Sequence, residues 1–199
     1  NFEIYLFGED ERENSTVNKY QSCLNTFLDY VTKKLHVNAN LDYRDYELVS
    51  RKNESGSKVF LLKEHVERII NYQTDNEKHE KVKDLFIFSI LTGVRYSDLC
   101  RINKSFVKGK ILQFRMFKTL TDVNIPLHKK AIEILKKYDY KISEICNSIK
   151  DYNVVLKELC KKAGLTETVS QLKIYNTSKV DQESFFYENI SSHVARNTF

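Results

Sequence analysis

Apolar residues recur at helical spacing along most of this chain, with polar residues between them. The first such segment follows a possible N-cap at Ser15-Thr16 and carries an apolar stripe that begins Tyr20, Leu24, Phe27. The same spacing predicts further helices at 62–72, 82–91, 97–102, 128–138 and 151–163, and a last one from 191 or 192 onward. The segment 82–91 is apolar on almost every side, which is typical of a central helix, and Gly93 offers a stop.

Between residues 110 and 127 the apolar period changes from helical spacing to two. This alternation predicts two strands joined by a turn through 119–122. The single proline, Pro126, lies near the end of the second strand, which suits an edge strand because proline has no N–H to donate. Residues 170–187 are expected to be irregular or weakly strand-like. The fold class is therefore predicted to be mainly α with a small antiparallel β-sheet, an α+β arrangement.

The chain is expected to divide near residue 50. With 199 residues and 41% hydrophobic residues, it is long enough for one to two domains with a real core. The stretch 49–57 lacks apolar periodicity, so the organisation predicted is a helical unit at 1–50, a linker at 51–58 and a larger unit at 59–199. The apolar stripe of the first helix cannot bury itself, so that helix is expected to pack against something else.

Several classes of protein are disfavoured by composition. No apolar run approaches the roughly 20 residues of a membrane span, and no leader-like segment opens the chain. The four cysteines are scattered without metal-ligand spacing, which favours small apolar residues in a reducing compartment. We therefore expect a cytoplasmic protein with no membrane partner, no metal and no other cofactor.

Charge is distributed unevenly, although the net charge is only +5. The segment 1–14 is acidic, whereas 101–130 is basic and has Asp122 as its single acidic residue. The basic residues of that segment are Arg101, Lys104, Lys108, Lys110, Arg115, Lys118, Lys129 and Lys130. A lysine-rich stretch is usually a solvated surface, but a cluster this one-sided favours a polyanionic partner.

Four basic side chains are candidates for binding a phosphate. Arg95 lies between the helix stop at Gly93 and a predicted helix N-cap at Ser97, where a guanidinium can add its donors to those of a helix start. The alternative for Arg95 is a structural ion pair with a nearby carboxylate such as Asp98. Lys118 is expected at a strand end entering the turn; the alternative is an ordinary exposed lysine.

The last two candidates lie near the end of the sequence. His193 and Arg196 are spaced i, i+3, which puts them on one face of a helix, one turn apart, where one phosphate could contact both. Taken alone, such a pair is more often just a surface histidine and a surface arginine.

The four candidates lie within three short motifs that follow one another along the chain. They are T-G-V-R-Y-S-D-L at 92–99, K-T at 118–119 followed by V-N-I-P-L at 123–127, and S-S-H-V-A-R-N-T-F at 191–199. This set resembles the three boxes of the tyrosine recombinases, the phage integrase family, and is similar to integrases of Bacteroidetes mobile elements. The resemblance covers most of 59–199, while 1–50 resembles the tail of that family's core-binding domain.

The resemblance implies a catalytic domain that cuts one DNA strand and forms a 3′-phosphotyrosyl link. Arg95 and Arg196 would bind the non-bridging oxygens of the scissile phosphate, with His193 beside them. Lys118 would protonate the leaving 5′-oxygen. Fixed donors aimed at these oxygens act mainly in the transition state, where negative charge accumulates. The implied partner is double-stranded DNA, with the complete protein acting as a homo-oligomer, a tetramer on DNA.

The chain also departs from the family pattern. The turn after Lys118 contains no glycine, and Asn197 replaces a residue that is often His or Arg. In the family a further His or Trp and the nucleophilic tyrosine follow the H-x-x-R box, and none of the twelve tyrosines here matches that position. We therefore expect a catalytic-domain fragment that is incomplete at its C-terminus and lacks its nucleophile. Two other hypotheses are a non-catalytic DNA-binding module and a helical interaction domain whose motif match is chance.

Overall fold

The computed structural model describes residues 5–6, 12–37, 40–45, 59–146, 148–175 and 178–199. The chain divides into two compact units, one formed by 1–57 with 170–183 and the other by 58–169 with 184–199. The predicted linker 51–58 lies outside the described residues, so the predicted division at this point stays a prediction. Each unit is described by itself.

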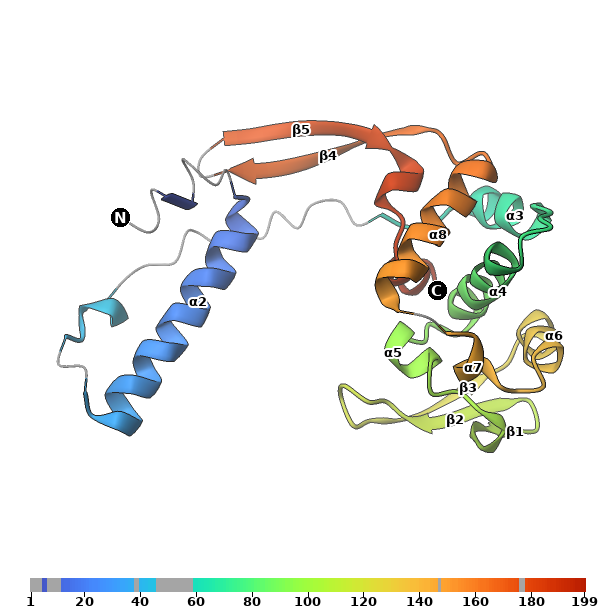
Figure 1. Ribbon diagram of the computed structural model, residues 1–199, viewed down its shortest axis with the longest axis horizontal. Coiled ribbons are helices and arrows are strands. Elements are labelled where there is room, and N and C mark those ends of the chain that lie inside the picture. The colour runs from blue at the N-terminus through green and yellow to red at the C-terminus, as the bar shows by residue number, and fades with distance from the viewer. Residues whose placement is uncertain (1–4, 7–11, 38–39, 46–58, 147, 176–177) are drawn as a thin grey trace. The chain divides into compact units, whose positions relative to one another are not determined.

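The second unit is mainly helical and carries a small antiparallel sheet, which confirms the predicted fold class (Figure 1). Its helices and strands, in chain order, are α3 (Lys63–Asn71), α4 (Glu77–Thr92), α5 (Tyr96–Leu99), β1 (Val107–Lys108), β2 (Ile111–Arg115), β3 (Asp122–Pro126), α6 (Lys129–Lys137), α7 (Ile142–Ile145), α8 (Ile149–Lys162) and α9 (Ser192–Thr198). Short 3-10 turns at Lys104–Phe106 and Phe186–Asn189 complete it.

Helix α4 is the centre of this unit. It packs against α3, α5, α6, α8 and α9, and its residues from Val82 to Ile90 are all buried. The hydroxyl of Ser89, on this buried stretch, donates to the carbonyl of Leu85 at 2.9 Å and so leaves no unpaired polar group there. The helix ends at Gly93, which has a left-handed φ of 63°. The predicted central helix and its stop are both confirmed.

The small sheet has the strand order β1-β2-β3, with antiparallel neighbours. Leu112 and Phe114 of β2 are buried, whereas the residues between and beside them are exposed, which is the alternation that the sequence predicts. Pro126 pairs with Ile111 on the edge strand β3, as expected for a residue without an N–H. The hairpin is therefore confirmed, with its turn at 116–121.

The first unit contains helix α2 (Asn14–Tyr30), which continues as π-helix to Leu35. Only Val17 and Gln21 of α2 are buried. The stripe residues Leu24 and Phe27 remain 43% and 60% exposed. The expectation that this apolar stripe is covered is therefore wrong for the part of the chain that the structure describes.

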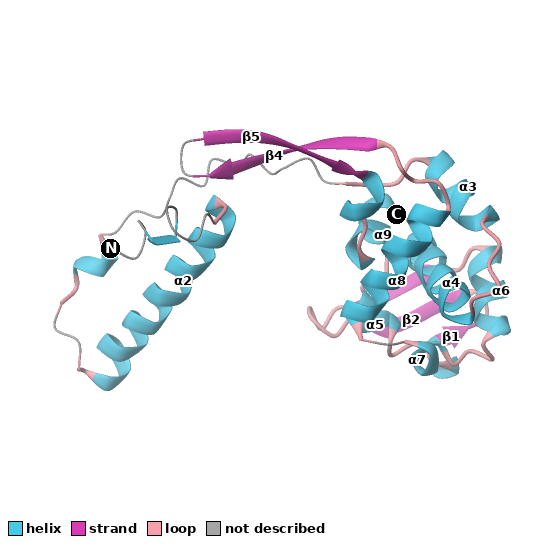
Figure 2. Cartoon of the chain, turned by 45° about the horizontal axis from the view of Figure 1, so that its top comes forward, coloured by secondary structure: helices cyan, strands magenta, loops and turns pink. Residues whose placement is uncertain are grey.

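The segment predicted to be irregular or weakly strand-like forms a long hairpin (Figure 2). Strands β4 (Thr168–Tyr175) and β5 (Ser178–Phe185) have eight residues each. Strand β5 is exposed over nearly its whole length. The prediction understated this element because a strand with no buried face needs no alternation of apolar and polar residues, which is the signal that sequence analysis uses.

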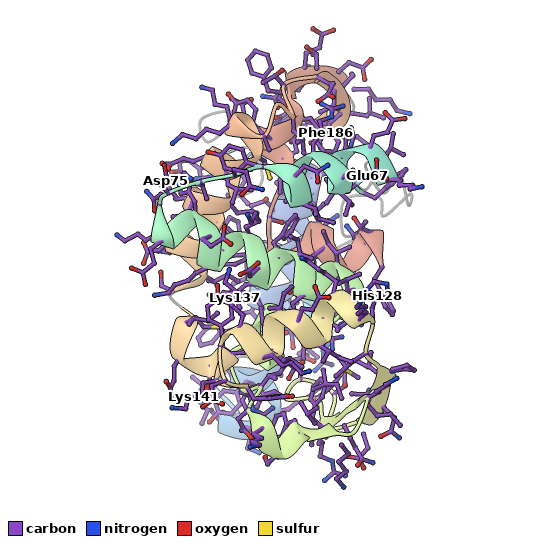
Figure 3. All side chains as sticks on the ribbon, turned by 90° about the vertical axis from the view of Figure 1, so that its right-hand side faces the viewer. Glu67, Asp75, His128, Lys137, Lys141 and Phe186 are labelled. Carbon is purple, nitrogen blue, oxygen red and sulfur yellow. The ribbon has the colours of Figure 1, made fainter. Side chains whose placement is uncertain are left out.

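A charged network joins α4 to α6. The ammonium of Lys137, at the C-terminal end of α6 (Figure 3), donates to Asp84 at 2.6 Å and to Glu80 at 2.7 Å. Glu80 also pairs with Lys83 at 2.7 Å, and Asp84 accepts a second hydrogen bond at 2.8 Å from the hydroxyl of Tyr138. Because the carboxylate of Asp84 is buried, these donors replace the water that it loses on folding.

This network predicts a pH dependence of stability. Partial burial raises the pKa of Glu80, but hydrogen bonds from Lys137 and Lys83 outweigh that effect and leave the pKa below its ordinary value. A carboxyl group with a lowered pKa stabilises the folded state above its unfolded pKa, and the contribution disappears as pH falls through the folded pKa. We expect Glu80→Gln to cost about 1 kcal/mol of unfolding free energy near pH 7 and clearly less near pH 3, as measured by urea unfolding.

Glu133→Gln is the matched control. Glu133 forms an exposed pair with Lys130 at 3.6 Å, so its loss should change the unfolding free energy by less than about 0.5 kcal/mol at either pH. Equal effects of the two substitutions at neutral pH would contradict the stabilising role of the network.

Candidate functional site

Arg95 lies in the short connection between α4 and α5. Val94 beside it is buried, which fixes the connection against the core, and the backbone carbonyl of Arg95 accepts the N–H of Leu99 at 2.8 Å. Arg95 itself is therefore the N-cap of α5, which begins at Tyr96 and has only four residues. The predicted cap at Ser97 is wrong, and the helix predicted at 97–102 is present but begins one residue earlier and ends at Leu99. A single helical turn has a small dipole, so an anion here would be bound mainly by the arginine side chain.

The Arg95 guanidinium extends toward the β2–β3 hairpin. Its Nη1 lies 3.1 Å from the sulfur of Met116, which is the first residue of the hairpin turn. The side chain is half-buried. Arg95 is thus held beside the turn that carries Lys118, although the two residues are far apart in the sequence.

Asp98 does not pair with Arg95, so the structural ion pair considered for Arg95 is not formed. The Asp98 carboxylate is 1% exposed and accepts the backbone N–H of Phe117 at 2.8 Å. It also lies 3.5 Å from Nη1 of Arg101. Asp98 therefore attaches the beginning of the hairpin turn to α5. The sequence carried no signal for this role, because the bonded atoms belong to residues 19 positions apart.

Lys118 is exposed and lies within the turn itself, because β2 already ends at Arg115. The expected position at a strand end is therefore corrected by a few residues. Two backbone hydrogen bonds close the turn, from Leu120 N–H to Met116 carbonyl at 3.0 Å and from Met116 N–H to Thr121 carbonyl at 2.9 Å. In this glycine-free turn, Leu120 takes a left-handed φ of 53°.

His193 and Arg196 are carried by α9, which packs against α4 and α8. Val194 and Ala195 are the buried residues of this helix. His193 is exposed and Arg196 is half-buried. The hydroxyl of Thr198 fastens the end of α9 by accepting the backbone N–H of Leu61 at 2.9 Å. The predicted terminal helix is confirmed.

Gly93 and Phe199 bring the end of α9 to the end of α4. A β-carbon at Gly93 would lie 2.7 Å from the Phe199 ring, so the ring packs directly on the glycine. Two residues after Gly93 comes Arg95, and three residues before Phe199 comes Arg196. The structure thus brings the α4–α5 connection, the hairpin turn and the end of α9 to the C-terminal end of α4.

The four candidate cations lack acidic partners. In the described ranges of the chain, no carboxylate forms an ion pair with Arg95, Lys118, His193 or Arg196. The basic residues of 101–130 are all exposed. The single acidic residue of that segment, Asp122, is paired with Arg115 at 3.3 Å. An external anion would therefore meet unpaired positive charge at this end of α4.

Two further properties concern the described residues only. They contain no group of three or more His, Cys, Asp or Glu side chains placed to hold a metal ion. None of their helices has the length and apolar character needed to cross a membrane. Of the cysteines, Cys160 is buried as expected, whereas Cys23 is exposed and Cys100 and Cys146 are half-buried.

Comparison with known proteins found structural similarity alone. No protein-family model and no curated protein matches the chain. Six solved chains match its structure, and one of them is the crystal structure of XerA recombinase, with 18% sequence identity and a TM-score of 0.45. That match covers 98% of this chain and 63% of the XerA chain, so this chain spans less than two thirds of its length.

The packing of Phe199 on Gly93 predicts an unequal response to alanine at two glycines. Gly93 and Gly109 have nearly the same φ, 63° and 62°, but nothing lies within 4 Å of a β-carbon at Gly109. Gly109→Ala should therefore cost only the strain of a left-handed residue, about 1 kcal/mol. Gly93→Ala should cost about 1 kcal/mol more in thermal or urea unfolding, because the Phe199 ring must also move.

A double substitution separates strain from the ring contact. Adding Phe199→Ala to Gly93→Ala should remove the excess cost and leave only the strain that Gly109→Ala shows. Equal costs for the two glycine substitutions would contradict a close contact between α9 and the end of α4.

Proposed function

We propose that this end of α4 binds the scissile phosphate of DNA, and that the chain is the phosphate-activating part of a tyrosine-type site-specific recombinase. The observation that carries the proposal is the gathering of Arg95, Lys118, His193 and Arg196. The Arg95–Met116 contact and the Gly93–Phe199 contact join the three segments that carry these residues near the C-terminal end of α4, and none of the four has a carboxylate partner among the described residues. Such an arrangement suits a phosphodiester, which presents negative oxygens and carries no protons to donate.

The four side chains have different roles in the proposed reaction. Arg95 and Arg196 bind the two non-bridging oxygens, and His193 adds a hydrogen bond to them. Guanidinium groups suit this role because their donors lie in a fixed fork and stay protonated. As the phosphorus becomes pentacoordinate, its equatorial oxygens gain negative charge, so donors held there stabilise the transition state more than the ground state.

Lys118 is the proposed general acid. A tyrosine phenolate, formed by loss of the hydroxyl proton to water, attacks the phosphorus, the bond to the 5′-oxygen breaks, and the ammonium of Lys118 gives its proton to that oxygen. The resulting 3′-phosphotyrosyl bond preserves the phosphodiester, so the reverse steps with another 5′-hydroxyl rejoin the strand. None of the tyrosines in residues 1–199 matches the family position of the nucleophile, so the proposal assigns it to a residue outside them.

The surroundings of the site support double-stranded DNA as the substrate. Lys104, Lys108 and Lys110, which lie beside or on the small sheet that bears the hairpin, are all exposed. Phosphates of the flanking duplex would meet these lysines, and the released counterions would favour binding. Assembly as a tetramer on DNA, a role in a mobile element and a cytoplasmic location belong to the same proposal.

The binding part of the proposal is tested with the 199-residue chain and a mixed-sequence duplex. We expect fluorescence anisotropy to show binding that weakens steeply with salt. Arg95→Ala and Arg196→Ala should each reduce the salt slope by about 1, since each removes one phosphate contact. Lys63→Ala removes the same charge from an exposed position on α3 and should leave the slope nearly unchanged. Absence of binding at low salt would contradict the proposal.

The cleavage part is tested with the full-length protein and a nicked suicide duplex of its own attachment site. The wild type should form a covalent protein–DNA adduct that withstands denaturation. Arg95→Ala or Arg196→Ala should slow adduct formation by about 10²–10³, which is typical for the loss of one donor to a developing oxyanion. Lys63→Ala again serves as the control. Normal DNA binding without any adduct would instead favour the non-catalytic DNA-binding module.

A further inference from the structure

The hairpin turn that carries Lys118 exposes two large apolar side chains. Phe117 and Leu120 are each 67% exposed, and they flank Lys118 in the sequence. Two such residues at the tip of a hairpin contribute little to the core of the protein. Large apolar side chains exposed next to a proposed binding site indicate contact with a partner.

Leu120 is also strained. Its φ of 53° lies in the left-handed region, which glycine and asparagine adopt readily and leucine adopts only at an energetic cost. Hydrogen bonds from the Leu120 N–H to Met116 and from the Met116 N–H to Thr121 enforce the conformation. A turn selected for folding alone would carry glycine here. The unfavourable backbone conformation thus holds an apolar side chain in an exposed position. Strain of this kind concentrates at functional sites.

Polar contacts fix the backbone and the ring of Phe117. Its backbone N–H donates to the buried carboxylate of Asp98, and its ring lies under the Arg101 guanidinium, 5.4 Å from the charged carbon. Arg101 also donates to the carbonyl of Arg115 at 3.4 Å. The apolar tip is therefore held outward by polar contacts behind it, and little ordering entropy is lost when a partner binds.

The charge around the tip favours a nucleic acid as that partner. The Arg101 guanidinium lies over the Phe117 ring, and Lys118, next to Phe117 in the sequence, is exposed. Apolar residues within a basic surface are how many proteins open the minor groove of DNA, because a phenylalanine or leucine pushed between two base pairs unstacks them.

We propose that Phe117 and Leu120 form an apolar wedge that enters the minor groove and unstacks a base step beside the phosphate bound by Arg95 and Arg196. This inference rests on the proposed function, since the wedge acts on the same DNA. Unstacking bends the duplex locally and exposes the phosphate to the four basic side chains. The wedge also gives the site a preference for certain DNA sequences, because flexible pyrimidine–purine steps such as TA unstack more easily than other steps.

The test uses the 199-residue chain and a duplex of about two helical turns, roughly 20 base pairs, that contains TA steps labelled with 2-aminopurine. The fluorescence of this base rises when it is unstacked. We expect wild-type binding to raise the fluorescence. Leu120→Gly and Phe117→Ala should each weaken binding about tenfold and remove most of the rise.

Leu120→Gly is the decisive variant because it relieves the left-handed strain. Its folded state should be at least as stable as the wild type in thermal unfolding, so weaker DNA binding cannot come from misfolding. Val154→Ala removes another exposed aliphatic side chain, 57% exposed on α8, and should change neither binding nor fluorescence.

The outcomes separate the two proposals. Loss of affinity and of the fluorescence rise in both variants, with stability kept, supports the wedge. Wild-type binding without a fluorescence rise, or unchanged binding and fluorescence in both variants, overturns the wedge and leaves the phosphate site standing. A wild-type chain that binds no DNA at low salt overturns both.

Discussion

Burial of α4 is the constraint on which the larger unit depends. A helix that is apolar on almost every side is stable in water only if other elements cover all of its faces. Helices α3, α6, α8 and α9 provide that cover, with α5 attached at its C-terminal end. The candidate site is a consequence of this packing, because the elements that cover the end of α4 carry Arg95 and Arg196.

Buried acidic groups then fix the polar connections around this core. Asp84 accepts hydrogen bonds from Lys137 and Tyr138 at the end of α6, and Asp98 accepts one from the backbone N–H of Phe117, the second residue of the hairpin turn. A buried carboxylate is costly unless donors compensate it, so the two hydrogen bonds that Asp84 accepts, and the one that Asp98 accepts from Phe117, stabilise the fold. The four candidate cations are different, since no carboxylate of the described chain neutralises them. The described buried acidic residues thus bind partners within the fold, whereas these basic residues have no carboxylate partner there.

The hairpin turn departs from what folding alone would favour. Leu120 is strained and exposed. Phe117 is also exposed, although its backbone N–H is bonded to the buried carboxylate of Asp98. Natural sequences usually agree with their fold at every level, and the exceptions tend to occur at functional sites. The two departures in this turn lie close to Lys118, the residue proposed as general acid, so strain and proposed chemistry coincide there.

Elements with a local signal can be predicted from the sequence. The longer helices, the 110–127 hairpin, the stop at Gly93 and the edge position of Pro126 follow from side-chain period or from the backbone limits of one residue. Motif order likewise singled out the four basic candidates, though not their surroundings.

Contacts between groups that are distant in sequence became known from the three-dimensional packing. The Asp98 bond to the turn, the Phe199 ring on Gly93, the exposed stripe of α2 and the long β4–β5 hairpin depend on partners remote in sequence or on the lack of a covering surface. Local periodicity records whether a residue prefers burial. It does not record which segment will bury it, because that depends on how the whole chain covers α4.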